Sequence, residues 1–324
     1  MSIDMKEINS ILITGIAGGL AKITAGLLAK KYPTIKITGV DSRDIKLDFQ
    51  KENIKTVQIK YSRSNFERLF RENNFDAILH LGRVSHAEAN PMGNLEKRLD
   101  LNVMGTKRIM DLALRFGVKK NIILSTYHVY GALADNSVFI DEESPLRASI
   151  KYPELRDVVE MDLFATNWMW KNKEKVETIV LRPCSIIGPN IRNAMSLYLV
   201  SPYTPIGIDF NPMFQFIHEY DMANIIIRSL ESVPTGIYNV APKQEVISIK
   251  EAKKVIGLPT IPVPLIFLEQ TVKLLNFPYW KFPRYLIDYI KFSCIIDSKS
   301  ISQYIEGDFY RFTTKEALEL LKLE

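Results

Sequence analysis

The sequence predicts an α/β fold: a doubly wound parallel sheet with a smaller C-terminal lobe. The first observation is a series of short runs rich in Ile, Val and Leu, at 10–15, 35–41, 56–61, 76–82, 120–126 and 178–183. Such runs are typical of strands that are buried on both faces of a parallel sheet. The second observation is that helix-length segments separate these runs, including 19–31, 66–73, 94–117 and 153–172. We therefore expect crossover helices on both faces of the sheet.

The third observation is that the strict alternation of strands and helices ends after the sixth run. The following segment is richer in proline and aromatic residues. It contains a strand-like run at 236–241 and a final helical stretch that Thr313 or Thr314 can cap. We assign residues 1–190 to the sheet domain. Residues 191–324 are expected to form mainly a substrate-binding lobe, interleaved with the last strands of the sheet.

The composition is that of a soluble globular protein. Of the 324 residues, 47% are hydrophobic and 24% are charged, which provides enough apolar material for a large core. No apolar run approaches the ~18 residues that span a bilayer, and the N-terminus has no apolar leader, so we expect a cytoplasmic protein. The formal charge of +5 is spread along the chain. This argues against a nucleic-acid partner and suits an anionic small molecule. Cys184 and Cys294 stand far apart, so we expect buried free thiols rather than a disulfide or metal site.

A glycine-rich turn follows the first predicted strand. Gly15, Gly18 and Gly19 lie where the strand runs into the first helix. Glycine permits the tight turn and lets the backbone approach a pyrophosphate, which then faces the unpaired N–H groups of the helix start. Ala21 takes the place of a third glycine, where a small residue suffices for packing. The pattern is the fingerprint of a dinucleotide-binding Rossmann domain. It predicts cofactor contacts from Gly15, Ile16, Ala17, Gly18, Gly19 and Leu20.

The end of the second predicted strand bears on which dinucleotide binds. Asp41 lies about twenty residues beyond the glycine turn, where a carboxylate accepts hydrogen bonds from the adenosine ribose and repels a 2′-phosphate. This favours NAD over NADP. Arg43 weakens the preference, because its guanidinium could pair with such a phosphate. The expected cofactor is therefore NAD, with NADP left open.

Several segments resemble, in order, the landmarks of a known family. They are TGIAGGLA at 14–21, DAILHLG at 76–82, NVMGT at 102–106, LSTYHVYG at 124–131, LRPCSIIGP at 181–189, FQFIHEYDMA at 214–223 and GIYNVA at 236–241. Together they resemble the extended short-chain dehydrogenase/reductases, the group of NAD-dependent epimerases and dehydratases. The resemblance covers roughly residues 10 to 245. It implies a Rossmann domain, a nicotinamide cofactor and a homodimer that pairs through the two long helices.

The resemblance also implies a catalytic set. Thr126 stands where the family has a Ser or Thr that binds the substrate oxygen, and Tyr152 stands at the tyrosine of its YxxxK motif. That tyrosine exchanges a proton while the nicotinamide takes or gives a hydride. Arg156 replaces the lysine, and Glu160 matches a glutamate that often follows it. We expect Tyr152 to be the acid/base, tuned by Arg156. The alternative is a packing tyrosine, because Pro153 follows it directly and guanidinium geometry differs from that of an ammonium.

Further cofactor contacts follow from the resemblance. Leu81, Gly82 and Arg83 end the fourth predicted strand, beside the cofactor in the family. Arg83 could bind phosphate or be a solvated loop charge. Asn102 resembles the family's asparagine that supports the helix on the cofactor side, and Pro183 resembles the residue that packs near the nicotinamide.

The substrate is less well specified. Arg192 and Arg284 could bind the diphosphate of a nucleotide sugar, the commonest substrate class of the resembling family. A hydrophobic, sterol-like alcohol is the second choice. Segment 259–293 combines prolines, aromatic residues and basic residues. We interpret it as the apolar underside of the small lobe, in preference to a substrate cover or a membrane-surface patch.

Two hypotheses about function remain open at this point. The first is an NAD(P)-dependent oxidoreductase or epimerase that acts on a secondary alcohol or its ketone. The second is a non-catalytic NAD(P)-binding sensor or interaction protein, which kept the glycine turn while Tyr152 drifted. The spacing of Thr126, Tyr152, Arg156 and Glu160 has stayed in register, and drift would not preserve it. We therefore prefer the enzyme.

Overall fold

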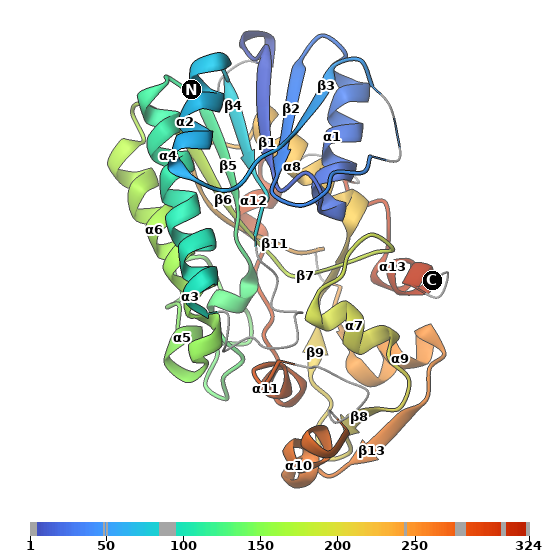
Figure 1. Ribbon diagram of the computed structural model, residues 1–324. Helices are drawn as coiled ribbons and strands as arrows, with labels where there is room; N and C mark the ends of the chain where they lie inside the picture. The colour runs from blue at the N-terminus through green and yellow to red at the C-terminus, as the bar shows by residue number, and fades with distance from the viewer. Residues whose placement is uncertain are drawn as a thin grey trace.

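The computed structural model of the protein describes residues 5–47, 49, 51–83, 95–242, 245–275, 283–305 and 309–321. Its centre is a seven-stranded parallel sheet in the order β11-β6-β5-β4-β1-β2-β3 (Figure 1), which confirms the predicted fold class. The strands are β1 (Ser10–Thr14), β2 (Lys36–Asp41), β3 (Ile54–Gln58), β4 (Ala77–His80), β5 (Lys120–Leu124), β6 (Glu177–Pro183) and β11 (Gly236–Val240). β1 pairs with β2 on one side and β4 on the other, so the strand order reverses there.

Helices cover both faces of the sheet. Figure 1 shows α2 (Arg63–Glu72), α4 (Gly105–Arg115) and α6 (Arg156–Asn172) together on one side. On the other side, α1 (Gly19–Lys31) packs against α8 (Glu219–Glu231). α1 has the bounds that the sequence predicts. α2 begins earlier than expected because the Ser62 side chain caps it, accepting a hydrogen bond from the backbone N–H of Asn65.

The predicted strand runs form the core of each face. On the α2 and α4 face, Leu12 and Ile78 of the sheet are fully buried with Phe66 and Phe70. On the opposite face, alternate sheet residues such as Ile11 join the buried residues of α1 and α8 in a larger cluster that extends into the C-terminal half. Each such apolar side chain contributes about 1.5–3 kcal/mol on burial. Burial on both faces explains why these strands are apolar throughout.

Two predicted helices differ from the structure in their first turns. The segment predicted at 94–117 contains α3 (Leu95–Arg98), a π-helical turn at Leu99–Met104 and then α4, while residue 94 lies outside the described residues. The segment predicted at 153–172 begins with a 3₁₀ turn, Pro153–Leu155, which α5 (Ala148–Lys151) precedes. Proline lacks the N–H needed to continue a helix and holds the residue before it in extended geometry. Within the segment predicted at 153–172, α-helix therefore starts only at Arg156, the first residue of α6.

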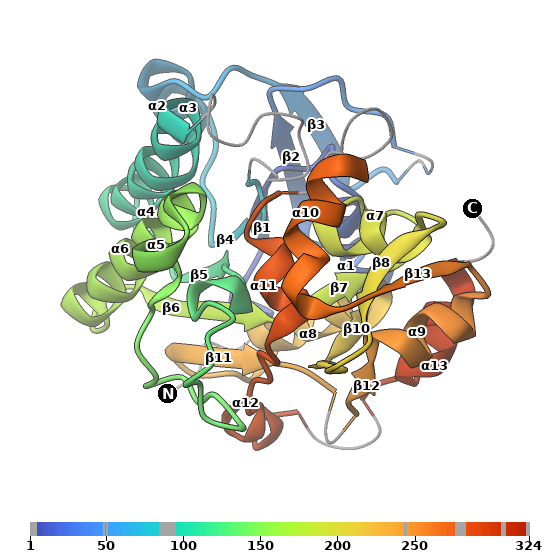
Figure 2. The ribbon, with the colours of Figure 1, turned by 90° about the horizontal axis from the view of Figure 1, so that it is seen from below.

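The smaller lobe lies below the sheet in Figure 1, and Figure 2 shows it from beneath. Its strands pair two by two: β7 (Ser185–Ile187) with β10 (Phe216–His218), β8 (Thr204–Gly207) with β13 (Thr260–Val263), and β9 (Met213–Phe214) with β12 (Ile247–Ser248). Its helices are α7 (Ala194–Val200), α9 (Ile249–Ile256), α10 (Leu265–Leu275), α11 (Leu286–Lys291) and α13 (Thr314–Leu320), while α12 (Lys299–Ser302) packs against β11 of the sheet. Thr313, rather than Thr314, caps α13 through a capping box with Glu316. α8 and β11 come from the same half of the chain but belong to the sheet layers.

Segment 259–293 contains β13, α10 and α11, and its residues 276–282 lie outside the described residues. α11 is largely buried, with Leu286 and Tyr289 at 1% exposure. α10 buries Leu268 but exposes Ile266 and Phe267. The described part of this segment is therefore mainly packed against the lobe, with one apolar face of α10 open to solvent.

Candidate functional site

A cleft of about 360 Å³ at the carboxyl ends of β1, β4, β5 and β6 is the candidate site. It lies where the strand order reverses, the position at which open α/β sheets bind ligands. Eleven of the residues predicted from the sequence line it: Gly15, Ala17, Gly18, Gly19, Leu20, Arg43, Leu81, Arg83, Thr126, Pro183 and Arg192.

Other described residues line the cleft without having been predicted: Ala21, Leu124, Ser125, Tyr127, His128, Cys184, Ser185, Ile186, Asn190, Ile191 and Asn193. Most of them lie in or directly after the segments LSTYHVYG and LRPCSIIGP, which follow β5 and β6. Side chains just beyond the carboxyl ends of parallel strands gather at the same edge of the sheet. Their position after two predicted strands was therefore the signal that could have identified them.

The glycine turn forms one wall of the cleft. Gly15 has φ of +78°, and a Cβ atom placed on it would lie 2.3 Å from the Cα of Gly82. α1 starts directly after Gly18, and no side chain caps its first turn. Its first N–H groups and the positive end of its dipole therefore suit an anion such as a pyrophosphate. The turn has the features that NAD requires.

Asp41 and Arg43 meet at the end of β2. Arg43 donates from Nε to Asp41 Oδ1 at 3.1 Å and from Nη2 to Oδ2 at 2.9 Å. The backbone N–H of Ala17 also donates to Asp41 Oδ2, at 3.1 Å. Burial raises the pKa of Asp41, but the hydrogen bonds from Arg43 and Ala17 outweigh it and hold that pKa below its usual range. Asp41 is thus an ionised group that tethers the turn, and Arg43 stands between it and the cleft.

Four predicted cofactor contacts do not line the cleft among the described residues: the buried Asp41 described above, Ile16, Gly82 and Asn102. Ile16 is fully buried. Gly82 packs against Gly15 of the glycine turn. Asn102 is buried and donates from Nδ2 to Asp157 Oδ2 at 2.6 Å. Asp157 also pairs with Arg98, whose Nε lies 3.4 Å from Oδ2. Asn102 therefore joins the π-helical turn to α6 from within the protein.

Thr126 lines the cleft and follows β5 by two residues. It caps a 3₁₀ turn, Tyr127–Val129, and its Oγ1 lies 3.0 Å from Nδ1 of His128. The backbone N–H of His128 donates to the same oxygen at 3.4 Å. The structure therefore brings Thr126 and an unpredicted histidine together in the cleft.

Tyr152 does not line this cleft. Its hydroxyl donates to Asp288 Oδ2 at 2.6 Å and contacts the backbone oxygen of Ala132 at 3.2 Å. Lys151 also pairs with Asp288, at 2.9 Å. Burial raises the pKa of Tyr152, and the neighbouring carboxylate of Asp288 raises it further. This environment keeps the tyrosine protonated, whereas the expected chemistry requires the opposite shift.

Arg156 and Arg284 lie on the surface rather than in the cleft. Arg156 Nε donates to Glu160 Oε1 at 2.5 Å, one helical turn along α6. Its side chain is 60% exposed. Arg284 pairs with Glu269 at 3.2 Å and is 78% exposed. The structure therefore does not bring Arg156 to the hydroxyl of Tyr152, although the spacing in sequence is that of the family motif.

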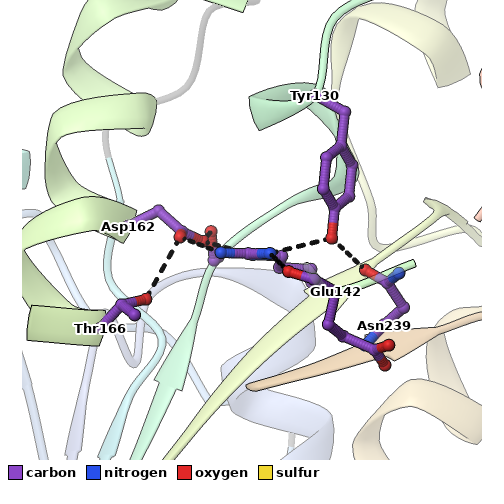
Figure 3. A network of polar contacts seen from close by, with 7 residues as sticks. Tyr130, Glu142, Asp162, Thr166 and Asn239 are labelled. Atoms are coloured by element: carbon purple, nitrogen blue, oxygen red, sulfur yellow. Dashed lines mark hydrogen bonds and ion pairs between the residues drawn. The ribbon is translucent and has the colours of Figure 1, made fainter. Parts of the chain in front are cut away.

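A buried polar network supports the segment that carries Thr126 (Figure 3). Arg182 on β6 donates from Nη2 to Asp162 Oδ1 at 2.6 Å and from Nη1 to the hydroxyl of Tyr130 at 2.9 Å. Asp162 on α6 accepts a hydrogen bond from Ser125. Tyr130 in turn donates to Asn239 Oδ1 on β11, at 2.8 Å. The network holds the residue before Thr126 between α6, β6 and β11.

Cys184 and Cys294 are buried free thiols, as the sequence predicts. Within the described part of the chain, no cluster of His, Cys, Asp and Glu could hold a metal ion. No helix in that part is long and apolar enough to cross a membrane.

A match to the model of a protein family identifies the family of this chain. The model described as the NAD dependent epimerase/dehydratase family matches residues 11–241. The chain belongs to this family. Its members are NAD-dependent enzymes, so NAD is the cofactor and the non-catalytic alternative is not favoured. The glycine turn and the uncapped start of α1 are the parts of this chain that fit NAD.

The curated relatives described here have low sequence identity to this chain. A dTDP-D-glucose 4,6-dehydratase of Mus musculus is 26% identical over 263 residues, which cover 76% of this chain and 72% of the relative. An uncharacterized protein of Mycobacterium tuberculosis is 21% identical over 257 residues, which cover 78% of this chain and 67% of the relative.

Solved structures share the fold over nearly the whole chain. The dTDP-glucose 4,6-dehydratase from Bacillus anthracis, in complex with NAD, has a TM-score of 0.73 at 17% identity, covering 97% of this chain and 95% of that one. The UDP-glucose 4-epimerase from Thermotoga maritima, with UDP-glucose, has a TM-score of 0.70 at 16% identity, covering 97% of each chain. At these identities the likeness shows the fold alone.

Proposed function

We propose that the protein oxidises or reduces a secondary alcohol of a nucleotide sugar, using NAD held in the cleft. The observation that supports this most strongly is the cleft itself, where the glycine turn, Thr126 and Arg192 surround one volume. When bound, NAD supplies the acceptor or donor of a hydride. The chain supplies the groups that bind both ligands, orient the sugar oxygen and move its proton.

The cofactor side of the proposal rests on the first half of the sheet. The start of α1 receives the pyrophosphate, because its N–H groups have no side-chain cap. At the end of β2, Arg43 lines the cleft and meets the adenosine ribose, with the buried Asp41 behind it. Leu81 and Pro183 also line the cleft, where an apolar surface suits a nicotinamide ring.

The substrate side rests on Arg192. This residue is exposed and lines the cleft just before α7, so its guanidinium can pair with a diphosphate. The names of the mouse relative and the Thermotoga maritima neighbour, which act on dTDP-D-glucose and UDP-glucose, support this substrate class. Arg284 was predicted for the same role, but it pairs with Glu269 at the surface. We therefore assign the diphosphate to Arg192.

The acid/base role that the sequence predicts for Tyr152 is one of two alternatives, and the other is argued in the next subsection. The role of Tyr152 requires the hydroxyl to leave Asp288, which now accepts its proton in a 2.6 Å hydrogen bond. Thr126 needs no such movement, since it already lines the cleft. Thr126 is therefore the residue that we assign to binding the reacting oxygen of the sugar.

The experiment that tests this function is calorimetric titration of the protein with NAD, followed by UDP-glucose and dTDP-glucose. The chain offers a matched pair of exposed arginines, one in the cleft and one outside it. We expect Arg192→Ala to weaken sugar-nucleotide binding about tenfold, about 1.4 kcal/mol, and Arg284→Ala to change it by less than about twofold. Failure to bind NAD would refute the proposal. Equal losses in both variants would refute the assignment of Arg192.

We also propose a homodimer that pairs through α4 and α6, in a protein located in the cytoplasm. On α6, Leu163 is 45% exposed and Trp170 is 55% exposed, so that helix has apolar side chains available for a partner. Sedimentation velocity should show a dimer for the unmodified protein. Leu163→Arg should shift it to the monomer without lowering its thermal stability, and a monomeric parent protein would refute the pairing.

A further inference from the structure

Among the described residues that line the cleft, few can exchange a proton near neutral pH. The described lining residues that titrate are Arg43, Arg83, Tyr127, His128, Cys184 and Arg192. Arginine stays protonated in proteins. Burial raises the pKa of Tyr127 and that of the Cys184 thiol, so both keep their protons. Histidine is the side chain suited to proton exchange in this range, which singles out His128.

The contact between His128 and Thr126 has the geometry of a proton relay. Nδ1 of the imidazole lies 3.0 Å from Thr126 Oγ1, within hydrogen-bond distance. Both residues belong to the capped turn that follows β5, and both line the cleft. Ser125, just before that turn, donates a hydrogen bond to Asp162, which belongs to the polar network of Figure 3 and so holds the turn in place. The donor and acceptor therefore have fixed positions before a substrate arrives.

The small lobe fixes the other side of the imidazole. The ring of Tyr289 on α11 lies 4.9 Å from the His128 ring, nearly perpendicular to it, and that of Tyr285 lies 5.5 Å away. The hydroxyl of Tyr289 also donates to the backbone oxygen of His128 at 3.2 Å. Both lobes thus hold one histidine in the cleft between them. A side chain positioned in this way is suited to act on a bound ligand.

We propose that Thr126 and His128 together take the proton of the substrate alcohol, the role that the family motif suggested for Tyr152. This inference rests on the proposed function. When the alcohol is oxidised, its carbon loses a hydride to NAD and the C=O bond forms. The hydroxyl proton passes to Thr126 Oγ1 while the proton of Thr126 passes to His128 Nδ1. In the reduction of a ketone, each transfer runs in the opposite direction.

The groups that face His128 are compatible with this exchange. Tyr127 lies beside it in the same turn. Tyr289 belongs to α11, and Tyr285 is the residue directly before that helix. Burial raises the pKa of all three, so they remain neutral. Arg83 provides a positive charge in the same cleft, which offsets only part of the rise that burial causes in the pKa of Tyr285.

The tautomer of His128 tests the relay without any substrate. The protein has four histidines, so nitrogen NMR of a histidine-labelled sample gives few signals, and His128→Asn identifies the relevant ones. We expect Nδ1 to be unprotonated and to accept a hydrogen bond from Thr126. Thr126→Val should shift the Nδ1 signal, while Thr126→Ser should keep it. A protonated Nδ1, or an Nδ1 signal that Thr126→Val leaves unshifted, would overturn the proposal.

The kinetic test uses NAD with UDP-glucose or dTDP-glucose. We expect His128→Asn to lower kcat about 100-fold or more, the range for a lost general base, and to remove the fall in rate at acid pH. His128→Phe keeps the aromatic packing and should lose as much. Tyr152→Phe should change kcat less than about threefold, since its hydroxyl lies outside the cleft. The opposite ranking, with Tyr152 essential and His128 dispensable, would overturn the proposal.

The two tests separate this inference from the proposed function. NAD titration of each His128 variant shows whether the cofactor site survives. If NAD binds but neither sugar nucleotide binds or reacts, the proposed substrate class fails, and the tautomer measurement alone decides the relay. If a sugar nucleotide reacts, the ranking of the His128 and Tyr152 variants decides it.

Discussion

The hydroxyl of Tyr152 donates to Asp288 Oδ2 at 2.6 Å, and this hydrogen bond joins the start of α6 to α11 of the small lobe. Lys151 pairs with the same carboxylate at 2.9 Å. Pro153 contributes to this arrangement, since it holds Tyr152 in extended geometry before the helix. The tyrosine that resembles a catalytic residue therefore has a structural partner from the other lobe.

We expect Tyr152→Phe to destabilise the protein by about 1–2 kcal/mol, because it removes a hydrogen bond to a charged group while Lys151 still pairs with Asp288. Urea denaturation measures the loss. Asp288→Asn should cost a similar amount. The double variant should cost less than the sum of the two, because both single changes break the same interaction. Fully additive losses would show that the hydrogen bond contributes nothing.

Arg43 should decide how well the site accepts NADP. Arg43→Ala leaves the carboxylate of Asp41 to repel a 2′-phosphate, so NADP affinity should fall at least about tenfold, about 1.4 kcal/mol. NAD affinity should change less than about threefold, because its ribose hydroxyls can donate to the freed carboxylate. Calorimetry with both dinucleotides checks this. Equal losses for both would instead place Arg43 on a group that they share.

Gly15→Ala should both destabilise the protein and abolish NAD binding. The substitution combines a strained backbone at φ +78° with a Cβ only 2.3 Å from the Cα of Gly82. Gly117 is the matched control, since its φ is +69° but nothing lies within 4 Å of a Cβ there. Gly117→Ala should cost about 1–2 kcal/mol of stability, the cost of the left-handed conformation, and leave NAD binding unchanged. NAD binding by Gly15→Ala at parental affinity would contradict this account.

The buried pair of Arg182 and Asp162 should be costly to break. Their side chains are 3% and 0% exposed, and their atoms approach to 2.6 Å. Asp162→Asn removes the charge that compensates Arg182 and should cost about 3–5 kcal/mol. Asp162→Leu combined with Arg182→Met should cost less than Asp162→Asn, because no buried charge is left alone. Urea denaturation compares the variants, and a larger loss in the double variant would contradict this reasoning.

His80 should make the protein less stable in acid. It lies buried between Thr14 Oγ1 at 2.7 Å and Thr106 Oγ1 at 2.9 Å, and burial lowers its pKa to about 4. The unfolded chain, with a histidine pKa of about 6.5, binds more protons between these two values. The free energy of unfolding should therefore fall by up to about 3 kcal/mol as the pH drops through that interval.

His80→Gln provides the control for this pH dependence, since glutamine keeps polar atoms near both threonines but does not titrate. Its urea denaturation should show a flatter loss of stability in acid than that of the parent protein. His218 also has its pKa lowered to about 4 by burial, so part of the slope should remain. An unchanged slope in His80→Gln would assign the acid sensitivity to other groups.

The sheet and the cofactor turn were predictable because their signals are local. Runs of Ile, Val and Leu mark strands buried on both faces, and helix start and turn chemistry depend on neighbouring residues. Gly15 and Asp41 follow from this reasoning, as do the bounds of α1. The π-helical turn at Leu99–Met104 was not predictable, because no local pattern distinguishes it from regular helix.

The sequence by itself determined the fold, the dinucleotide turn and the position of Thr126 at the end of β5, since each depends on patterns within a few residues. The tertiary structure alone decided which side chains share the cleft. Tyr152 meets Asp288 from 136 residues away, and His128 meets Tyr289 from 161 residues away. Spacing along one helix cannot predict such contacts, because they depend on how the small lobe packs against the sheet. For that reason the motif singled out Tyr152 and Arg156, whereas the folded chain places His128 beside Thr126.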